Sequence, residues 1–160
     1  MRFSPVFALL ALLATPVAAQ QVAFGGIKAD ARAPVEVTAD SLNVNQADGT
    51  AVFTGNVLVV QGGLRMQAAT IRVGYAPDDR TKIQTMTATG GVTLVSPTEA
   101  AESKEAVYDV AGGSVVMTGD VLLKQGQNVM SGQKLSVNLR SGTGQMDGRV
   151  RTILQPGTQK

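Results

Sequence analysis

The residue types that carry most enzyme chemistry are sparse in this 160-residue chain. Histidine and cysteine are absent, which removes the commonest general base, metal ligand and thiol nucleophile. Ser103 and Lys104 could form a serine–lysine pair, but adjacent residues of a strand point to opposite faces, so we do not expect them to act together. Asp78 and Asp79 could hold a cation, yet they follow Pro77 and fit a solvated turn better.

The remaining charged residues form no recognisable site. Four aspartates, Asp40, Asp109, Asp120 and Asp147, lack EF-hand or facial-triad spacing. The C-terminal third has a mild basic bias that could contact lipid phosphates, although a solvated face is the favoured interpretation: Lys124, Lys134, Arg140, Arg149 and Arg151. No dense basic stripe is present and aromatic residues are few, so nucleic-acid binding is not expected. We therefore predict a protein that is not an enzyme and that uses no metal or cofactor.

What organises the chain is a repeat. Phe53–Val59 reads Phe-Thr-Gly-Asn-Val-Leu-Val, and the pattern returns at 88–94, at 117–123 and, more weakly, at 146–152. The central glycines, Gly55, Gly90, Gly119 and Gly148, are spaced by 35, 29 and 29 residues. A period of this length indicates a repeat architecture.

A second pattern lies between these stretches and keeps the same steps. Its apolar positions Leu42, Ile71, Ala106 and Leu135 are spaced by 29, 35 and 29 residues, so the repeat is a whole unit. The six extra residues of the longer step fall near Gly74–Arg80, which is predicted to be a loop.

Alternate residues around each glycine are apolar, as in Ala51, Phe53, Val57 and Val59, which places them on one face of a strand. A glycine at the centre of that face indicates a bend or bulge. We therefore predict an all-β fold of about sixteen short antiparallel strands built from four repeats. The apolar faces of the two halves would enclose a groove, and the open ends would invite strand addition from another chain.

The side chains predicted to line this groove share the inward parity and are mostly aliphatic or methionine. Methionine accommodates irregular apolar ligands, although ordinary core packing is an alternative explanation for the five methionines among them. The predicted groove residues are Val37, Leu42, Val44, Phe53, Val57, Val59, Met66, Ile71, Val73, Met86, Val92, Leu94, Met117, Val121, Leu123, Met130, Leu135, Val137 and Met146.

The chain begins with a predicted export signal, residues 1–19. Arg2 gives a positive start, Val6–Leu13 is an apolar core too short to span a bilayer, and Val17–Ala19 are small residues before an expected cut near Ala19/Gln20. A retained N-terminal anchor is the alternative. Residues 20–33 are expected to be a flexible leader, 34–156 the folded domain, and 157–160 a C-terminal tail.

Several of these stretches resemble the OstA-like repeat of the LptA family of periplasmic lipopolysaccharide transport proteins. They are Thr54–Val57 with its Gln61–Gly62 turn, the return strand Gly132–Val137, and the opening strand Pro34–Asp40. The resemblance covers about residues 34–156 and implies a folded β-jellyroll, the β-taco. The insertion loop and the C-terminal tail are short, which puts in doubt the contacts that those segments make elsewhere in the family.

The resemblance also implies a function. The lipid A acyl chains of lipopolysaccharide would lie in the groove, and subunits would stack head to tail as a bridge across the periplasm. The bridge would run from an LptC-like inner-membrane component to an LptD-like outer-membrane component. The alternative is a structural adaptor with a closed interior, or an LptC-like module, assembling edge to edge. A secreted hydrolase is disfavoured by the residue inventory.

Overall fold

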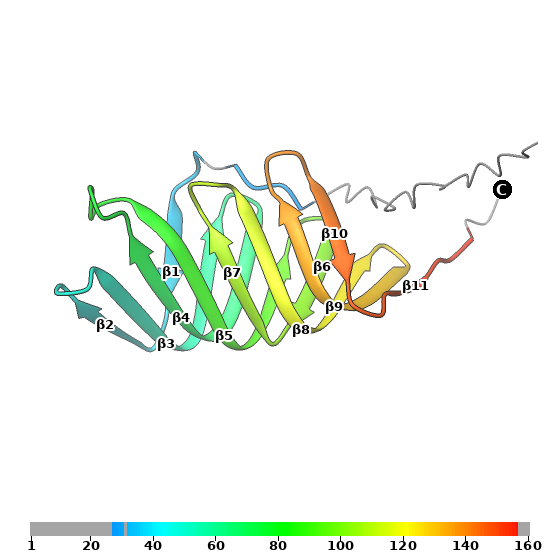
Figure 1. Cartoon of the computed structure of the whole chain (residues 1–160), viewed down its shortest axis with the longest axis horizontal. Coiled ribbons are helices and arrows are strands. Elements are labelled where there is room, and N and C mark those ends of the chain that lie inside the picture. Colours follow the sequence, from blue (N-terminus) through cyan, green and yellow to red (C-terminus); the bar gives the residue numbers. More distant parts are fainter. Residues whose placement is uncertain (1–26, 31, 157–160) are drawn as a thin grey trace, which may run out of the picture.

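The computed structural model describes residues 27–30 and 32–156, which form one antiparallel sheet of eleven strands and no helix. Figure 1 shows this sheet folded over on itself, so that its strands run up two facing sides. The predicted signal peptide, residues 1–19, and the C-terminal tail, residues 157–160, lie outside the described residues.

The strands follow one another with short connections. They are β1 (Val35–Thr38), β2 (Ser41–Asn45), β3 (Thr50–Gln61), β4 (Leu64–Tyr75), β5 (Ile83–Val95), β6 (Glu99–Ser103), β7 (Glu105–Asp109), β8 (Ser114–Gln125), β9 (Asn128–Asn138), β10 (Thr143–Asp147) and β11 (Arg151–Ile153). The longest connection, residues 76–82 between β4 and β5, contains all of the predicted insertion loop except Gly74 and Tyr75, which are the last residues of β4. The Arg80 guanidinium in this connection donates to the carbonyl of Gln46.

The all-β prediction is confirmed, and the predicted count of sixteen strands can be reconciled with the observed eleven. β3, β4, β5, β8 and β9 are each 11 to 13 residues long and pass through a corner of the fold. Counting these five on both sides of the corner gives the sixteen segments expected from four repeats. The strands are fewer because each of these five bends at its corner and continues to pair beyond it, as β3 does with a shift of register between Thr54 and Val57.

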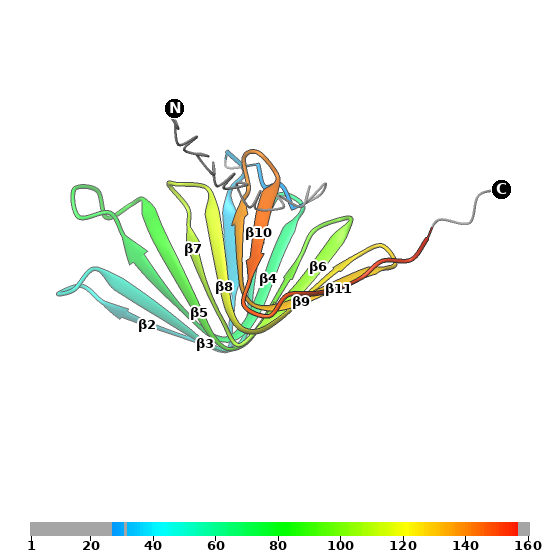
Figure 2. The ribbon, with the colours of Figure 1, turned by 45° about the vertical axis from the view of Figure 1, so that its right-hand side comes forward.

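The corners divide the sheet into two walls of eight segments each. Wall A contains β1, β6, β11, the C-terminal halves of β3, β5 and β8, and the N-terminal halves of β4 and β9; wall B contains β2, β7, β10 and the other halves. In both walls the segments lie in chain order, because every neighbour is antiparallel and reached by a local connection. Figure 2 shows the walls diverging from a shared closed edge.

The repeated glycines make this closed edge. Gly55 has a φ of 84° and is followed by Asn56 at 46°, and the same left-handed pair recurs in the other repeats, ending in Gly91, Asp120 and Arg149. L-residues rarely adopt such φ values, and asparagine and aspartate do so most readily. A Cβ on Gly55 would also lie 2.3 Å from the Asp40 carboxylate oxygen of the adjoining corner. The glycine is therefore required by the backbone bend and by the close approach of the neighbouring corner.

The core lies between the two walls. Buried and exposed residues alternate along the strands, as in β4 and β7, because successive side chains point to opposite faces. The expected flexible leader differs from the structure at Ile27, whose side chain is fully buried in this core. An isoleucine removed from water contributes about 1.5–3 kcal/mol, which favours this position between the walls.

Candidate functional site

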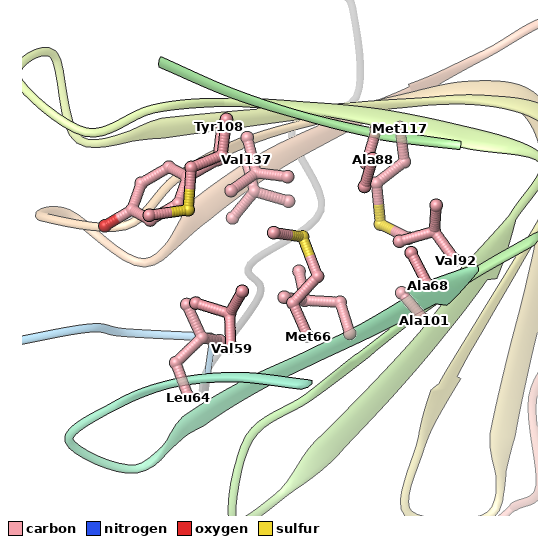
Figure 3. Packing of buried hydrophobic residues seen from close by; sticks show 14 of the residues in the cluster. Val59, Leu64, Met66, Ala68, Ala88, Val92, Ala101, Tyr108, Met117 and Val137 are labelled. Carbon is pink, nitrogen blue, oxygen red and sulfur yellow. The ribbon is translucent and has the colours of Figure 1, made fainter. Parts of the chain in front are cut away.

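Most of the predicted groove residues meet between the walls. Fourteen of the nineteen are buried in one hydrophobic cluster, and Val37, Phe53 and Met146 are partly buried against it. Figure 3 shows how side chains of the two walls point towards one another, with Met117 and Val137 from wall B facing Met66 and Val59 from wall A. The buried fourteen are Val57, Val59, Met66, Ile71, Val73, Met86, Val92, Leu94, Met117, Val121, Leu123, Met130, Leu135 and Val137.

The other two, Leu42 and Val44, are 54% and 58% exposed. They lie on the inward face, because they pair in register with Phe53 and Ala51. They are exposed because β2 is the last segment of wall B at this end and pairs only with β3. Val150, Ile153 and Leu154 are exposed at the other end of the fold. At the N-terminal end, therefore, the apolar inner face ends in the uncovered side chains of Leu42 and Val44.

Near the open edge, the interior between the walls is filled by its own side chains, whereas at the N-terminal end a cavity of about 510 Å³ is lined by Val44, Tyr75 and neighbouring residues. The cavity bounded by Val59, Leu64, Met66, Leu94 and Val115, with Gln61 and Tyr108, has a volume of about 10 Å³. That is room for one water at most, whereas ligand pockets usually measure about 300–1,000 Å³. Any long apolar ligand would therefore have to part the walls and take the place of their side-chain packing.

A hydrogen bond joins the walls near their open edge. The Tyr108 hydroxyl of wall B donates to Oε1 of Gln61 in wall A at 2.6 Å, and Nε2 of Gln61 donates to the Ala33 carbonyl at 3.2 Å. Burial raises the pKa of the Tyr108 hydroxyl above its usual value, and the Asp109 carboxylate raises it further. Tyr108 therefore stays a neutral donor at physiological pH.

A second polar pair lies on the same edge of wall A. Glu99 is only 4% exposed, and its Oε1 accepts a hydrogen bond of 2.6 Å from Nε2 of Gln125. Inward-facing polar residues such as Gln61 and Glu99 were missed by the sequence prediction, which selected apolar positions. Strand parity could have identified them, because each lies two residues from an inward apolar residue of the same strand and therefore points to the same face.

Other buried interior residues were also left out of the predicted groove. Periodicity could have found three of them, because Leu64 and Val115 share the inward parity of β4 and β8, and Leu139 continues the inward parity of β9 one residue after that strand ends. Ala106 is one of the apolar repeat positions, yet it and Ala101 were left out of the predicted groove because small residues carry a weak hydrophobic signal. Ile27 had no signal, because it precedes the first strand of the repeat pattern.

The polar candidates are separated by the fold. Ser103 faces inward and its Oγ donates to the Glu105 carbonyl at 2.8 Å, whereas Lys104 points outward and its Nζ lies 2.9 Å from Oδ2 of Asp120. That ion pair lowers the pKa of Asp120 and raises the pKa of Lys104. The serine and the lysine therefore do not form a catalytic pair.

Asp79 belongs to a solvated turn. Hydrogen bonds from the side chain and backbone of Thr81 lower the pKa of its carboxyl group, and Nζ of Lys82 lies 3.5 Å from its Oδ2.

Within residues 27–30 and 32–156, no three histidine, cysteine or acidic side chains gather as a metal site. The five basic residues of the C-terminal third are all exposed: Lys124, Lys134, Arg140, Arg149 and Arg151. In the same described part of the chain, no helix has the length and apolarity needed to cross a membrane.

Comparison with known proteins agrees with this geometry. A curated protein of Rhizobium meliloti that carries no functional name is 30% identical over 137 residues, covering 79% of this chain and 74% of that protein. The lipopolysaccharide export system protein LptA of Haemophilus influenzae is 24% identical over 156 residues, covering 90% of this chain and 89% of its own length.

The fold itself has been seen before. The crystal structure of LptH from Pseudomonas aeruginosa, described as the LptA-homologous periplasmic component of the lipopolysaccharide transport device, matches with a TM-score of 0.72. The match covers 80% of this chain and 99% of LptH at 20% identity, which establishes a shared fold. The family described as LptA/(LptD N-terminal domain) LPS transport protein matches residues 36–143. The chain therefore belongs to the LptA/LptD N-terminal domain family of lipopolysaccharide transport proteins.

Proposed function

We propose that this protein is a non-enzymatic periplasmic carrier that binds lipopolysaccharide through its lipid A acyl chains and passes it from the inner to the outer membrane. The observation that carries this proposal is the apolar interior, which extends along both walls and ends in the uncovered Leu42 and Val44. Membership in a lipopolysaccharide transport family supports the choice of lipid. Residues 1–19 would direct export and be removed.

The physics of the interior suits a sliding lipid. Each methylene removed from water contributes about 0.8 kcal/mol, so several acyl chains would compensate for the side-chain packing that is broken when the walls part. The buried methionines Met66, Met86, Met117 and Met130 have unbranched, flexible side chains that can re-pack around a chain of irregular shape. Many small apolar interactions of similar strength would let the acyl chains slide along the interior.

The ends of the fold suit head-to-tail assembly. At one end β1 and β2 each pair only with β3, and at the other β10 and β11 each pair only with β9. Unpaired strand edges are templates for strands of another chain. We propose that subunits stack through these edges, which would cover Leu42 and Val44 and join the interiors, with an LptC-like and an LptD-like partner at the two ends of the stack.

Site-specific photocrosslinking tests the carrier function. Photoreactive residues at Phe53, Val121 and Leu135 face the interior, and the same probe at the exposed Asn56 and Asn138 provides controls. We expect lipopolysaccharide adducts in cells at the three inward positions and none at the controls. An absence of adducts at all five positions, with the variants folded, would refute the carrier function.

A second candidate function is a structural adaptor that assembles edge to edge with a permanently closed interior. The filled interior, with its cavity of about 10 Å³, favours it. The two candidates differ in whether lipopolysaccharide ever reaches the interior side chains, which the same crosslinking experiment decides. Self-association without adducts is the outcome expected of the adaptor.

A further inference from the structure

The inner face of wall A ends in polar side chains along its open edge. Gln61 is the last residue of β3, Glu99 the first of β6 and Gln125 the last of β8. Gln61 and Glu99 are 2% and 4% exposed, and the next inward residue of β6, Ala101, is fully buried among apolar neighbours. The boundary between the polar edge and the apolar interior is therefore sharp.

One atom of this edge lacks a hydrogen bond. Gln61 is satisfied by Tyr108 and Ala33, and the amide of Gln125 binds Oε1 of Glu99. Oε2 of Glu99 has no hydrogen-bond partner. Within the described part of the chain, it is the one buried side-chain nitrogen or oxygen that lacks a hydrogen bond. Buried polar groups are almost always paired, so an orphaned carboxylate oxygen requires an explanation.

The turn that Glu99 helps to form does not provide the explanation. Its backbone N–H donates to Ser96 Oγ at 3.2 Å, and its carbonyl accepts from the Ser96 N–H at 2.9 Å. These bonds involve only the backbone of Glu99 and would form with many other side chains. The carboxylate is therefore free to serve a different purpose.

We infer that Oε2 of Glu99 accepts a hydrogen bond from the bound lipid, at the depth where acyl chains join the head group. This inference rests on the proposed lipid-carrier function. A carboxylate repels phosphate and accepts from hydroxyl or amide N–H groups. The ligand class is thus an amphiphile that carries hydroxyl or amide donors at the top of its acyl chains, as an acylated amino sugar does. The donor would fix how deeply the chains enter. Below Ala101 the inward side chains are apolar apart from Ser103, whose hydroxyl already donates to the Glu105 carbonyl.

The test compares two ligands on three proteins. Glu99→Gln keeps the side-chain shape and an oxygen for Gln125, but it replaces the free acceptor with an amide donor. Glu102→Gln is the matched control, because it removes the same charge from the same strand on the exposed outer face. Binding is measured by equilibrium titration with purified lipopolysaccharide and with methyl palmitate, which carries neither a charge nor a hydroxyl or amide donor. Thermal denaturation checks that all three proteins are folded.

We expect Glu99→Gln to weaken lipopolysaccharide binding about tenfold, the effect of losing one hydrogen bond to a charged group. Methyl palmitate binding should stay the same, and Glu102→Gln should change the affinity for neither ligand. Equal lipopolysaccharide affinity for Glu99→Gln and the wild type would overturn the role of Glu99 while leaving the carrier function in place. Equal weakening for both ligands would also overturn it, because that pattern indicates a general change of the interior. No lipopolysaccharide binding by the wild-type protein would overturn the carrier function together with the inference.

Discussion

Replacing Tyr108 by phenylalanine tests how the two walls are held together. The substitution removes only the hydroxyl, which donates to Gln61 across the interior at 2.6 Å in a buried position. A neutral hydrogen bond contributes about 0.5–1.5 kcal/mol, and an acceptor left unpaired in a buried site adds to the loss, so we expect the free energy of unfolding to fall by about 1–3 kcal/mol. For a domain of this size, each kcal/mol lowers Tm by roughly 3–5 °C.

Urea denaturation of four proteins separates the hydrogen bond from packing. The wild type, Tyr108→Phe, Gln61→Leu and the double variant form a double-mutant cycle, whose coupling term isolates the pair. We expect the double variant to be less destabilised than the sum of the two single variants, because neither polar group is then left unpaired. Tyr75→Phe is the matched control, since Tyr75 is only partly buried and its hydroxyl bonds to no other described residue.

The same hydroxyl predicts a dependence on pH. Because burial raises the pKa of Tyr108 in the folded protein, the neutral form is favoured by folding. Its contribution to stability is complete below the unfolded pKa of about 10 and is lost as the pH rises through the folded pKa. Wild-type stability should therefore decline more steeply above pH 10 than that of Tyr108→Phe. A cycle with no coupling and identical alkaline profiles for the two proteins would refute the reasoning.

Three further predictions concern the closed edge, its ion pair and the free end. Gly119→Ala should destabilise the protein by about 1–2 kcal/mol more than Gly91→Ala in urea denaturation. Both glycines have φ near +85°, but a Cβ on Gly119 would lie 2.9 Å from the Cβ of Lys104, whereas a Cβ on Gly91 would have none of the surrounding atoms within 4 Å. Equal losses of stability in the two variants would contradict the role of close approach between corners. Asp120→Asn should leave Tm within experimental error at physiological salt, because the Lys104–Asp120 pair is exposed and screened; a clear drop would show that the pair holds the corners. Val44→Lys should shift any head-to-tail oligomer towards the monomer in sedimentation experiments, because it places a charge on the uncovered inner face of β2; an unchanged size distribution would exclude that face from the interface.

The repeat, the corners and the parity of the walls could all be predicted from local sequence. Gly55, Gly90, Gly119 and Gly148 mark the corners in the structure as predicted, because a left-handed backbone selects glycine locally. Alternation then indicated which side chains face inward, since a period of two residues is a property of the strand itself. Fourteen of the nineteen predicted groove residues are buried for this reason.

How the two walls meet could not be predicted in this way. The Tyr108–Gln61 bond joins residues 47 positions apart, and the distance between the walls depends on how all interior side chains pack together. Neither property has a period that a sequence could display. The exposure of Leu42 and the burial of Ile27 likewise depend on which segment lies last in a wall and on what covers the core. Strand pattern is local and is visible in the sequence, whereas closure of the interior and the orphaned Glu99 oxygen arise from contacts between distant segments.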